Sequence, residues 1–351
     1  MRDLLAEPTD FDWLVRGLLA RPTYGQIAGE MKTLKSYVAG FVAVGIASGK
    51  PIFGQFTPPS PGPVVAYIGE GGRALWTRRI RRISAAMGVD PGALDLHPTF
   101  DVAPITSLRF QDSLRRDLEE VRPALVLLDP LYTFHGTTTR AADLHQEGAL
   151  LNQLSAPCMA EGVSLLVVNH FNQSGAGIGL KRITMAGSGE WADSWLLLAH
   201  REGTKQVEAG SFGLSLEIGS RQWGGTTWEL DFDIGRFDEE TGTHDGEITW
   251  GLRRASATTK VATSKCVETQ MAIREALSDR PWSLTKTELK MLVGGSRRLF
   301  ADAMDELVRK GVIAHDLVGR IEAGITKKRP LWGLTPTRAQ ADRPSWQEED
   351  S

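Results

Sequence analysis

Short apolar runs alternate with longer segments of helical periodicity between residues 24 and 200. This alternation predicts a largely parallel sheet whose strands are joined by helices. Ahead of it, residues 1–20 have the apolar spacing of an amphipathic lead-in helix. The predicted strands of the sheet are residues 24–28, 64–68, 98–102, 124–128, 163–168 and 194–199.

The pattern changes in residues 206–252, which are rich in β-compatible residues, glycine and tryptophan. Strands are predicted there at residues 214–218 and 227–232, both of which alternate apolar with polar positions. We therefore expect residues 1–254 to form one α/β domain with a β-rich end. Residues 255–264, dominated by Ala, Ser and Thr, have the composition of a linker.

A second, smaller domain is predicted over residues 265–335. Its pattern predicts three helices, at about 266–278, from Ser283 onward and over 296–311. The second helix has a Ser or Thr cap with Glu288 three residues after Thr285. Residues 312–314 and 327–334 follow as the two sides of a wing, so this segment is interpreted as a winged helix. The charged, Pro-containing tail 336–351 is expected to be disordered.

Composition narrows the class of protein. The 351 residues carry a net charge of −3, so the chain is not basic as a whole. Cys158 and Cys266 are far apart and form no C-x-x-C, which argues against a disulfide framework and a zinc site. No apolar run reaches membrane-spanning length, and the N-terminus lacks the apolar core of a signal peptide. We expect a cytoplasmic protein that makes no membrane contact.

The candidate chemistry begins at residues 29–36, Gly-Glu-Met-Lys-Thr-Leu-Lys-Ser. This is the phosphate-binding P-loop pattern G-x-x-x-x-G-K-[ST] with leucine in place of the last glycine, and it lies between a predicted strand and a predicted helix. In such a loop the lysine neutralises phosphate charge and the serine binds Mg²⁺. The alternative is a chance surface turn. The predicted nucleotide contacts are Gly29, Glu30, Met31, Lys32, Thr33, Leu34, Lys35, Ser36 and Tyr37.

Three later strands end in polar side chains. Asp129 closes the apolar run 124–128, as a Walker B aspartate that holds Mg²⁺ does, although a strand-terminal Asp can also simply start a turn. Glu70 follows strand 64–68 and is a candidate to activate the attacking water. Asn169 and His170 end strand 163–168 and are candidates to sense the γ-phosphate. Ligands of parallel sheets bind at this edge, so the sequence predicts a site for ATP and Mg²⁺.

These segments resemble the RecA-like P-loop ATPases, and within them the RepA-type replicative helicases of plasmids and phages and their AAA-25 relatives. The resemblance covers about residues 10–235 and includes "LLDPLYTF", "LLVVNHFNQSG" and "MAGSGEWADSWLLLAHR". It implies that Lys35 and Ser36 bind phosphate and Mg²⁺, that Asp129 is the Walker B ligand, that Glu70 is the catalytic base and that His170 is the sensor.

The resemblance also implies a role for Arg221, in the segment Gly-Ser-Arg-Gln-Trp-Gly at 219–224. It would be the arginine finger that enters the ATP site of a neighbouring subunit, so the active form would be an oligomer, by resemblance a hexamer. The alternative is an Arg at a hairpin turn. The chain departs from the family pattern at Leu34, at Asn169 and Gln173 in the sensor element, and at Gly219, where a lysine often stands.

DNA is the expected partner. Residues 265–335 hold 13 Lys and Arg against 9 Asp and Glu, a local net charge of +4 that suits phosphate contact. The main hypothesis is an ATP-driven DNA helicase, with single-stranded DNA passing through the ring and duplex DNA at the winged helix. The alternatives are a nucleotide-switched DNA-binding regulator or loader, and a binding module without activity. The candidate DNA contacts are Lys181, Arg182, Arg297, Arg298, Lys327, Lys328 and Arg329.

Overall fold

The structure is a computed structural model of the chain. It describes residues 11–136, 144–172, 178–184, 188–201, 209–255, 269–309, 311–322 and 325–335. The chain divides into two compact units, with the boundary between Ala255 and Ser256. The predicted linker after residue 255, the N-terminal ten residues and the tail from residue 336 lie outside the described residues.

A nine-stranded sheet forms the centre of the first unit, in the order β13-β10-β9-β8-β3-β7-β6-β4-β5. The six strands from β8 to β5 in this order are mutually parallel, and β9, β10 and β13 continue the sheet in antiparallel pairing. The bounds are β3 Tyr24–Gly29, β4 Val64–Ile68, β5 Leu96–Thr99, β6 Leu125–Asp129, β7 Ser164–His170, β8 Ser194–His200, β9 Ser211–Ser220, β10 Gly224–Asp233 and β13 Thr249–Arg254.

All eight predicted strands of this unit are present, and one is displaced. The prediction of residues 98–102 is wrong in its second half, because β5 is Leu96–Thr99 and the following residues leave the sheet. β5 is an edge strand that pairs only with β4, over Val64–Tyr67, and this register fixes where it ends. The strands predicted at 214–218 and 227–232 form the central parts of β9 and β10.

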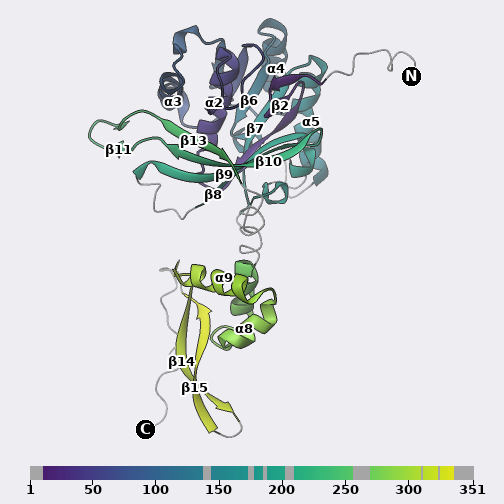
Figure 1. The fold of residues 1–351 in the computed structure, drawn as a ribbon. Coiled ribbons are helices and arrows are strands. Elements are labelled where there is room, and N and C mark those ends of the chain that lie inside the picture. Colours follow the sequence, from purple (N-terminus) through teal and green to yellow (C-terminus); the bar gives the residue numbers. More distant parts are fainter. Residues whose placement is uncertain are drawn as a thin grey trace. The chain divides into compact units, whose positions relative to one another are not determined.

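Helices cover both faces of the sheet (Figure 1). Strand residues of one parity, such as Ala66, Leu127 and Val168, pack in one hydrophobic cluster with α2. Their neighbours of the other parity, Tyr67 and Val167 among them, form a second cluster with α4 and α5. This period of two places each strand-terminal side chain on a definite face. The helices are α2 Lys35–Ser48, α3 Gly72–Ala86, α4 Leu108–Glu120, α5 Leu144–Ala160 and α6 Ser188–Trp191.

Short elements complete the first unit. The 3-10 turns are η1 Pro91–Ala93, η2 Leu131–Phe134 and η3 Leu180–Arg182. β11 Phe237–Asp238 pairs with β12 Thr243–His244 in a small hairpin beyond β10. Within the described ranges, no helix combines the length and the apolar character needed to cross a membrane.

The predicted lead-in helix is wrong over its described part. Residues 11–20 contain β1 Trp13–Val15 and β2 Leu19–Ala20, which pair antiparallel around a turn. Gly17 takes φ 74° in that turn, a backbone conformation that glycine enters most easily. The buried pairs Leu14–Val15 and Leu18–Leu19 have a spacing that fits one face of a helix, but here they pack into the first cluster from a hairpin.

The second unit consists of three helices and a hairpin. Residues 269–279 are helical, and α8 Lys286–Val293, α9 Arg297–Arg309, β14 Ile313–Glu322 and β15 Ile325–Leu334 follow. The predicted helix start is confirmed, because Thr285 and Glu288 form a reciprocal capping box at α8. A core of apolar side chains joins the helices to the hairpin.

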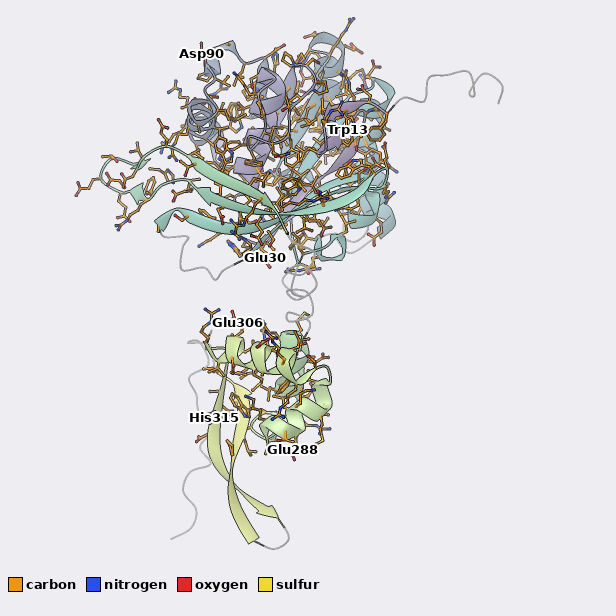
Figure 2. The ribbon with its side chains drawn as sticks, viewed as in Figure 1. Trp13, Glu30, Asp90, Glu288, Glu306 and His315 are labelled. Atoms are coloured by element: carbon orange, nitrogen blue, oxygen red, sulfur yellow. The ribbon has the colours of Figure 1, made fainter. Side chains whose placement is uncertain are left out.

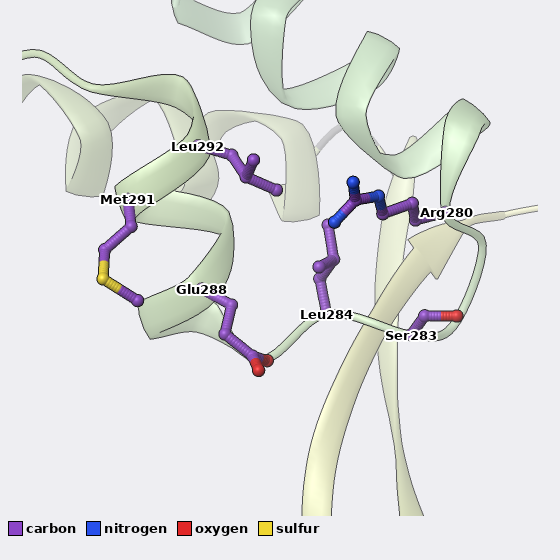
Figure 3. Close-up of a pocket in the computed structure, with 6 residues that line it drawn as sticks. All are labelled: Arg280, Ser283, Leu284, Glu288, Met291 and Leu292. Atoms are coloured by element: carbon purple, nitrogen blue, oxygen red, sulfur yellow. The ribbon is translucent and has the colours of Figure 1, made fainter.

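This unit also holds a surface cavity of about 470 Å³ beside α8 (Figure 3), and none of the predicted site residues lines it. The cavity is lined by Arg280, Ser283, Leu284, Glu288, Met291 and Leu292.

Candidate nucleotide-binding site

The loop between β3 and α2 has the geometry that the motif requires, with leucine taking the conformation of the missing glycine. Leu34 caps α2 in the left-handed region, at φ 58° and ψ 29°. Its carbonyl accepts hydrogen bonds from the backbone N–H groups of Tyr37 (2.8 Å) and Val38 (3.0 Å). Lys32 is left-handed as well, at φ 61°. The loop therefore turns sharply before α2, and the predicted strand–loop–helix context is confirmed.

Lys35 lies inside this loop. Its Nζ donates to the carbonyl of Glu30 (2.7 Å) and to that of Gly29 (3.2 Å). The side chain is 7% exposed, and burial lowers its pKa from 10.5 to about 8 against the opposing charges of Asp129, Glu30 and Glu70. Both of these hydrogen-bond partners are neutral carbonyls. Phosphate oxygens would supply the negative charge that the buried ammonium group needs in direct contact.

Ser36 and Asp129 meet although 93 residues separate them. The Ser36 hydroxyl donates to Oδ1 of Asp129 (3.1 Å), which ends β6. Burial raises the pKa of Asp129, and the charge of Arg79 and the Ser36 hydrogen bond oppose that rise. A hydroxyl and a carboxylate oxygen beside a phosphate loop are the hard ligands that Mg²⁺ takes together with phosphates and water. The residues present fit a bound Mg²⁺.

Glu70 lies at the same edge of the sheet. It follows β4, where Ile68 pairs with Asp129, and the backbone N–H of Gly69 donates to the Asp129 carbonyl (2.8 Å). The Glu70 side chain is exposed, and its negative charge acts on both Lys35 and Asp129. An exposed carboxylate at this position is open to water.

His170 ends β7 in register with Gly29, the first residue of the loop. Burial, and secondarily the charge of Lys35, lowers the pKa of the His170 imidazole, which favours its neutral form. The His170 ring lies 6.0 Å from the ring of Tyr132, between centroids. A neutral imidazole beside the phosphate loop can donate one hydrogen bond to a phosphate oxygen.

Asn169 does not belong to the site. Its side-chain amide donates to Oε1 of Gln26 (3.1 Å) and Oγ of Ser188 (3.2 Å), and the residue is 2% exposed. Neighbouring strand residues point to opposite faces, so Asn169 lies opposite His170 in a buried polar network. The prediction that Asn169 senses phosphate is wrong for this reason.

Arg79 is a site residue that sequence reasoning missed. It projects from α3, its positive charge opposes the burial that raises the pKa of Asp129, and its guanidinium lies 5.1 Å above the ring of Tyr37. The sequence offers one indication that Arg79 belongs to the site, its position in the third turn of the helix that begins after Glu70. Tyr37 itself, a predicted nucleotide contact, directs its N–H to Leu34 and its ring to Arg79 and Phe232.

Arg221 lies away from this edge. It follows β9, whose last residue Ser220 pairs with Ser194, at the beginning of β8. The P-loop follows the other end of the neighbouring strand β3, four residues or roughly 13 Å further along the sheet. The Arg221 guanidinium donates to the carbonyl of Glu190 in the same chain. Arg221 therefore does not reach the phosphate loop of its own chain.

The candidate DNA contacts lie in different surroundings. The Arg182 side chain pairs with Glu30 (3.1 Å) and is 13% exposed, so it faces the phosphate loop rather than solvent. Arg297 and Arg298 are exposed in the first turn of α9. The side chains of Lys181 in η3 and of Lys327, Lys328 and Arg329 in β15 lie outside what the structure describes.

Three features lie together at the carboxyl ends of the parallel strands: a loop with left-handed backbone residues, a buried lysine, and a serine hydroxyl bonded to an aspartate. Together they define a P-loop nucleotide-binding protein. The sequence model of AAA_25, described as an AAA domain, matches residues 1–176, and the chain belongs to this family. Membership indicates nucleotide binding and ATPase activity. A comparison of the sequence with curated proteins found no match.

Proposed function

We propose that this chain is a Mg²⁺-dependent ATPase that couples hydrolysis to DNA binding and translocation, as a replicative DNA helicase of a phage, plasmid or other mobile element. The observation that carries the ATPase part is the meeting of Lys35, Ser36 and Asp129 at one edge of the sheet. Lys35 binds and orients the phosphates of ATP. Bound at Ser36 and Asp129, Mg²⁺ supplies positive charge that stabilises the transferring phosphoryl group.

Glu70 and His170 complete the proposed site. The exposed Glu70 carboxylate accepts a hydrogen bond from the attacking water and orients it towards the γ-phosphate. Neutral His170 donates to a phosphate oxygen and so distinguishes a triphosphate from a diphosphate. Both roles depend on the side chains standing within hydrogen-bond reach of the phosphates, which their strand positions beside Gly29 and Asp129 support.

Arg221 acts in a neighbouring subunit in this proposal. Its position at the opposite ends of the strands, away from the phosphate loop of its own chain, supports a role in trans. A guanidinium supplied by a second copy stabilises the charge of the transition state. The proposed assembly is a homo-oligomeric ring, by resemblance a hexamer, with single-stranded DNA in its centre.

The second unit is proposed to be a winged helix that contacts duplex DNA. α9 takes the place of the recognition helix, and β14 with β15 forms the wing. Exposed Arg297 and Arg298 at the start of α9, and the Lys327–Arg329 run in β15, supply cations for phosphate contact.

One observation favours a slower, regulatory ATPase as the second candidate. A Cβ added to Gly219 would lie 2.4 Å from the ring of Trp195, so β9 has no room there for the lysine that often precedes an arginine finger. In this second candidate, hydrolysis would switch DNA binding or loading without driving unwinding.

The deciding experiment measures ATP hydrolysis with and without single-stranded DNA, together with unwinding of a forked duplex. The helicase proposal expects DNA-stimulated hydrolysis and unwinding. Lys35→Ala should abolish hydrolysis, whereas Lys50→Ala, at an exposed lysine after α2, should not. Glu70→Gln should lower turnover by about 100-fold with nucleotide binding retained, against Glu119→Gln on α4 as a control.

Three outcomes would contradict parts of this proposal. Hydrolysis by an assembled oligomer that unwinds no duplex leaves the regulator or loader. Full activity of Glu70→Gln removes its role as base. Oligomers mixed from Arg221→Ala and Lys35→Ala chains should recover activity at interfaces where an intact Arg221 of one chain faces an intact Lys35 of the other. Activity equal to that of the separate variants would exclude a finger in trans.

A further inference from the structure

Glu30, the second residue of the phosphate loop, has a carboxylate that forms hydrogen bonds with two other segments of the chain. Its Oε1 accepts a hydrogen bond from Nη1 of Arg182 (3.1 Å), and its Oε2 accepts one from the backbone N–H of His200 (3.0 Å). Figure 2 shows Glu30 at the edge of the first unit where the central strands end. These two partners lie 152 and 170 residues further along the chain.

The backbone of the same residue belongs to the phosphate loop. The Glu30 carbonyl accepts from Nζ of Lys35 (2.7 Å) and from the hydroxyl of Thr33 (2.8 Å), and its N–H donates to the carbonyl of Leu198 in β8 (3.1 Å). One residue therefore connects the lysine that binds phosphate to the segments that follow β7 and β8.

Arg182 is held on the other side by the chain that follows β7. Its Nη2 donates to the carbonyl of Asn172 (3.3 Å), and the Asn172 N–H donates back to the Arg182 carbonyl (2.7 Å). The guanidinium lies 4.9 Å above the ring of Phe171, and the N–H of Phe171 donates to the Gly29 carbonyl (3.0 Å). These contacts link Glu30, through Arg182, to Phe171 and Asn172, which follow His170.

Charge gives the pair a second consequence. A carboxylate in a loop that receives a triphosphate repels the ligand, and the positive charge of an arginine beside it offsets part of that repulsion. The two side chains are 30% and 13% exposed, so water screens the pair only in part. Bound phosphate oxygens would also compete with the Glu30 carbonyl for the N–H donors of Lys35, and this competition would weaken one contact that holds the Glu30 peptide.

We propose that Glu30 and Arg182 form a positioning pair that ties the phosphate loop to residues 178–184, so that nucleotide at Lys35 changes the placement of that segment. The proposal rests on the proposed function only in that the loop binds nucleotide. It assigns Arg182 to this pair in place of the direct DNA contact that the sequence suggested.

The first test compares the affinity for a fluorescent ATP analogue in Arg182→Gln, Glu30→Gln and the double variant. Arg182→Gln should weaken binding by about tenfold, because it leaves the Glu30 charge beside the phosphates. Adding Glu30→Gln should restore affinity to within about threefold of the unsubstituted protein, because that charge is then gone. Arg116→Gln, at an exposed arginine of α4, is the matched control and should bind normally.

Hydrogen exchange of residues 178–184 and 196–200 provides a readout that needs neither hydrolysis nor DNA. Glu30→Gln should speed exchange in both segments without nucleotide, and it should remove the change that the ATP analogue produces in residues 178–184. An Arg182→Gln effect that Glu30→Gln does not rescue, or unchanged exchange in Glu30→Gln, would overturn the pair. If the unsubstituted protein binds no nucleotide, the proposed function fails. The hydrogen exchange of Glu30→Gln without nucleotide then decides whether the pair holds the two segments.

Discussion

Leu34 adopts a left-handed backbone conformation that leucine disfavours. An L-residue in the left-handed region costs about 1–2 kcal/mol, and glycine avoids this cost. Leu34 takes φ 58° and packs its side chain against the first hydrophobic cluster, which offsets part of that cost. The departure from the P-loop pattern therefore leaves the shape of the loop intact.

At position 34, glycine should give a more stable protein than alanine, the reverse of their usual order of stability within a helix. Leu34→Ala keeps the left-handed cost and loses the packing, whereas Leu34→Gly loses the packing but removes the cost. The glycine variant should be more stable than the alanine variant by about 1 kcal/mol in urea unfolding. At Ala85, an exposed position inside α3, glycine should instead destabilise. An alanine variant at residue 34 as stable as the glycine variant would contradict this account.

Lys35 gives nucleotide binding a pH dependence. Its pKa of about 8 lies below the ordinary 10.5, so between these pH values the folded state binds fewer protons than the unfolded state. The Lys35 contribution to the free energy of unfolding therefore rises with pH in this window. Phosphate needs the ammonium form, so affinity for ADP should fall by about fivefold from pH 8 to pH 9.

The measurement is a titration with ADP from pH 7 to pH 9. Lys35→Arg is the control, because a guanidinium stays protonated over this range and its residual affinity should not change. An equal fall in both proteins would assign the pH dependence to another group.

At the scale of elements, local sequence patterns predicted most strands and one helix start correctly. The apolar runs identified the parallel strands, whose alternate residues pack into two clusters, and the capping box identified the start of α8. The hairpin of β1 and β2 was missed because buried pairs four residues apart fit both a helix face and two short strands. Its packing against the first cluster, a tertiary contact, decided between them.

Thr285→Ala should destabilise the start of α8. The Thr285 hydroxyl accepts from the Glu288 N–H (3.3 Å), and the Glu288 carboxylate accepts from the Thr285 N–H (2.9 Å). Loss of this box should cost about 1 kcal/mol and speed hydrogen exchange in residues 286–293. Ser283→Ala is the control, because that hydroxyl donates only to the Pro281 carbonyl (2.9 Å). Equal exchange in both variants would show that the cap is not stabilising.

At the scale of the molecule, strand order decides which distant residues meet. Parallel pairing of β4, β6, β7 and β3 brings Glu70, Asp129 and His170 to the edge where the phosphate loop begins. Antiparallel pairing of β9 with β8 sends Arg221 to the other edge. An arginine-finger role for Arg221 would therefore require a second subunit, as in the proposed ring.

The sequence by itself determined the phosphate loop, the strands that carry its partners and the capped helix of the second unit. These features depend on backbone conformation and periodicity, which a few neighbouring residues specify. Only the tertiary structure decided that Asn169 faces a buried network, that Arg79 approaches Asp129 and that Glu30 joins Arg182 and His200. Such contacts depend on the order and register of strands far apart in the chain, and no local pattern encodes them.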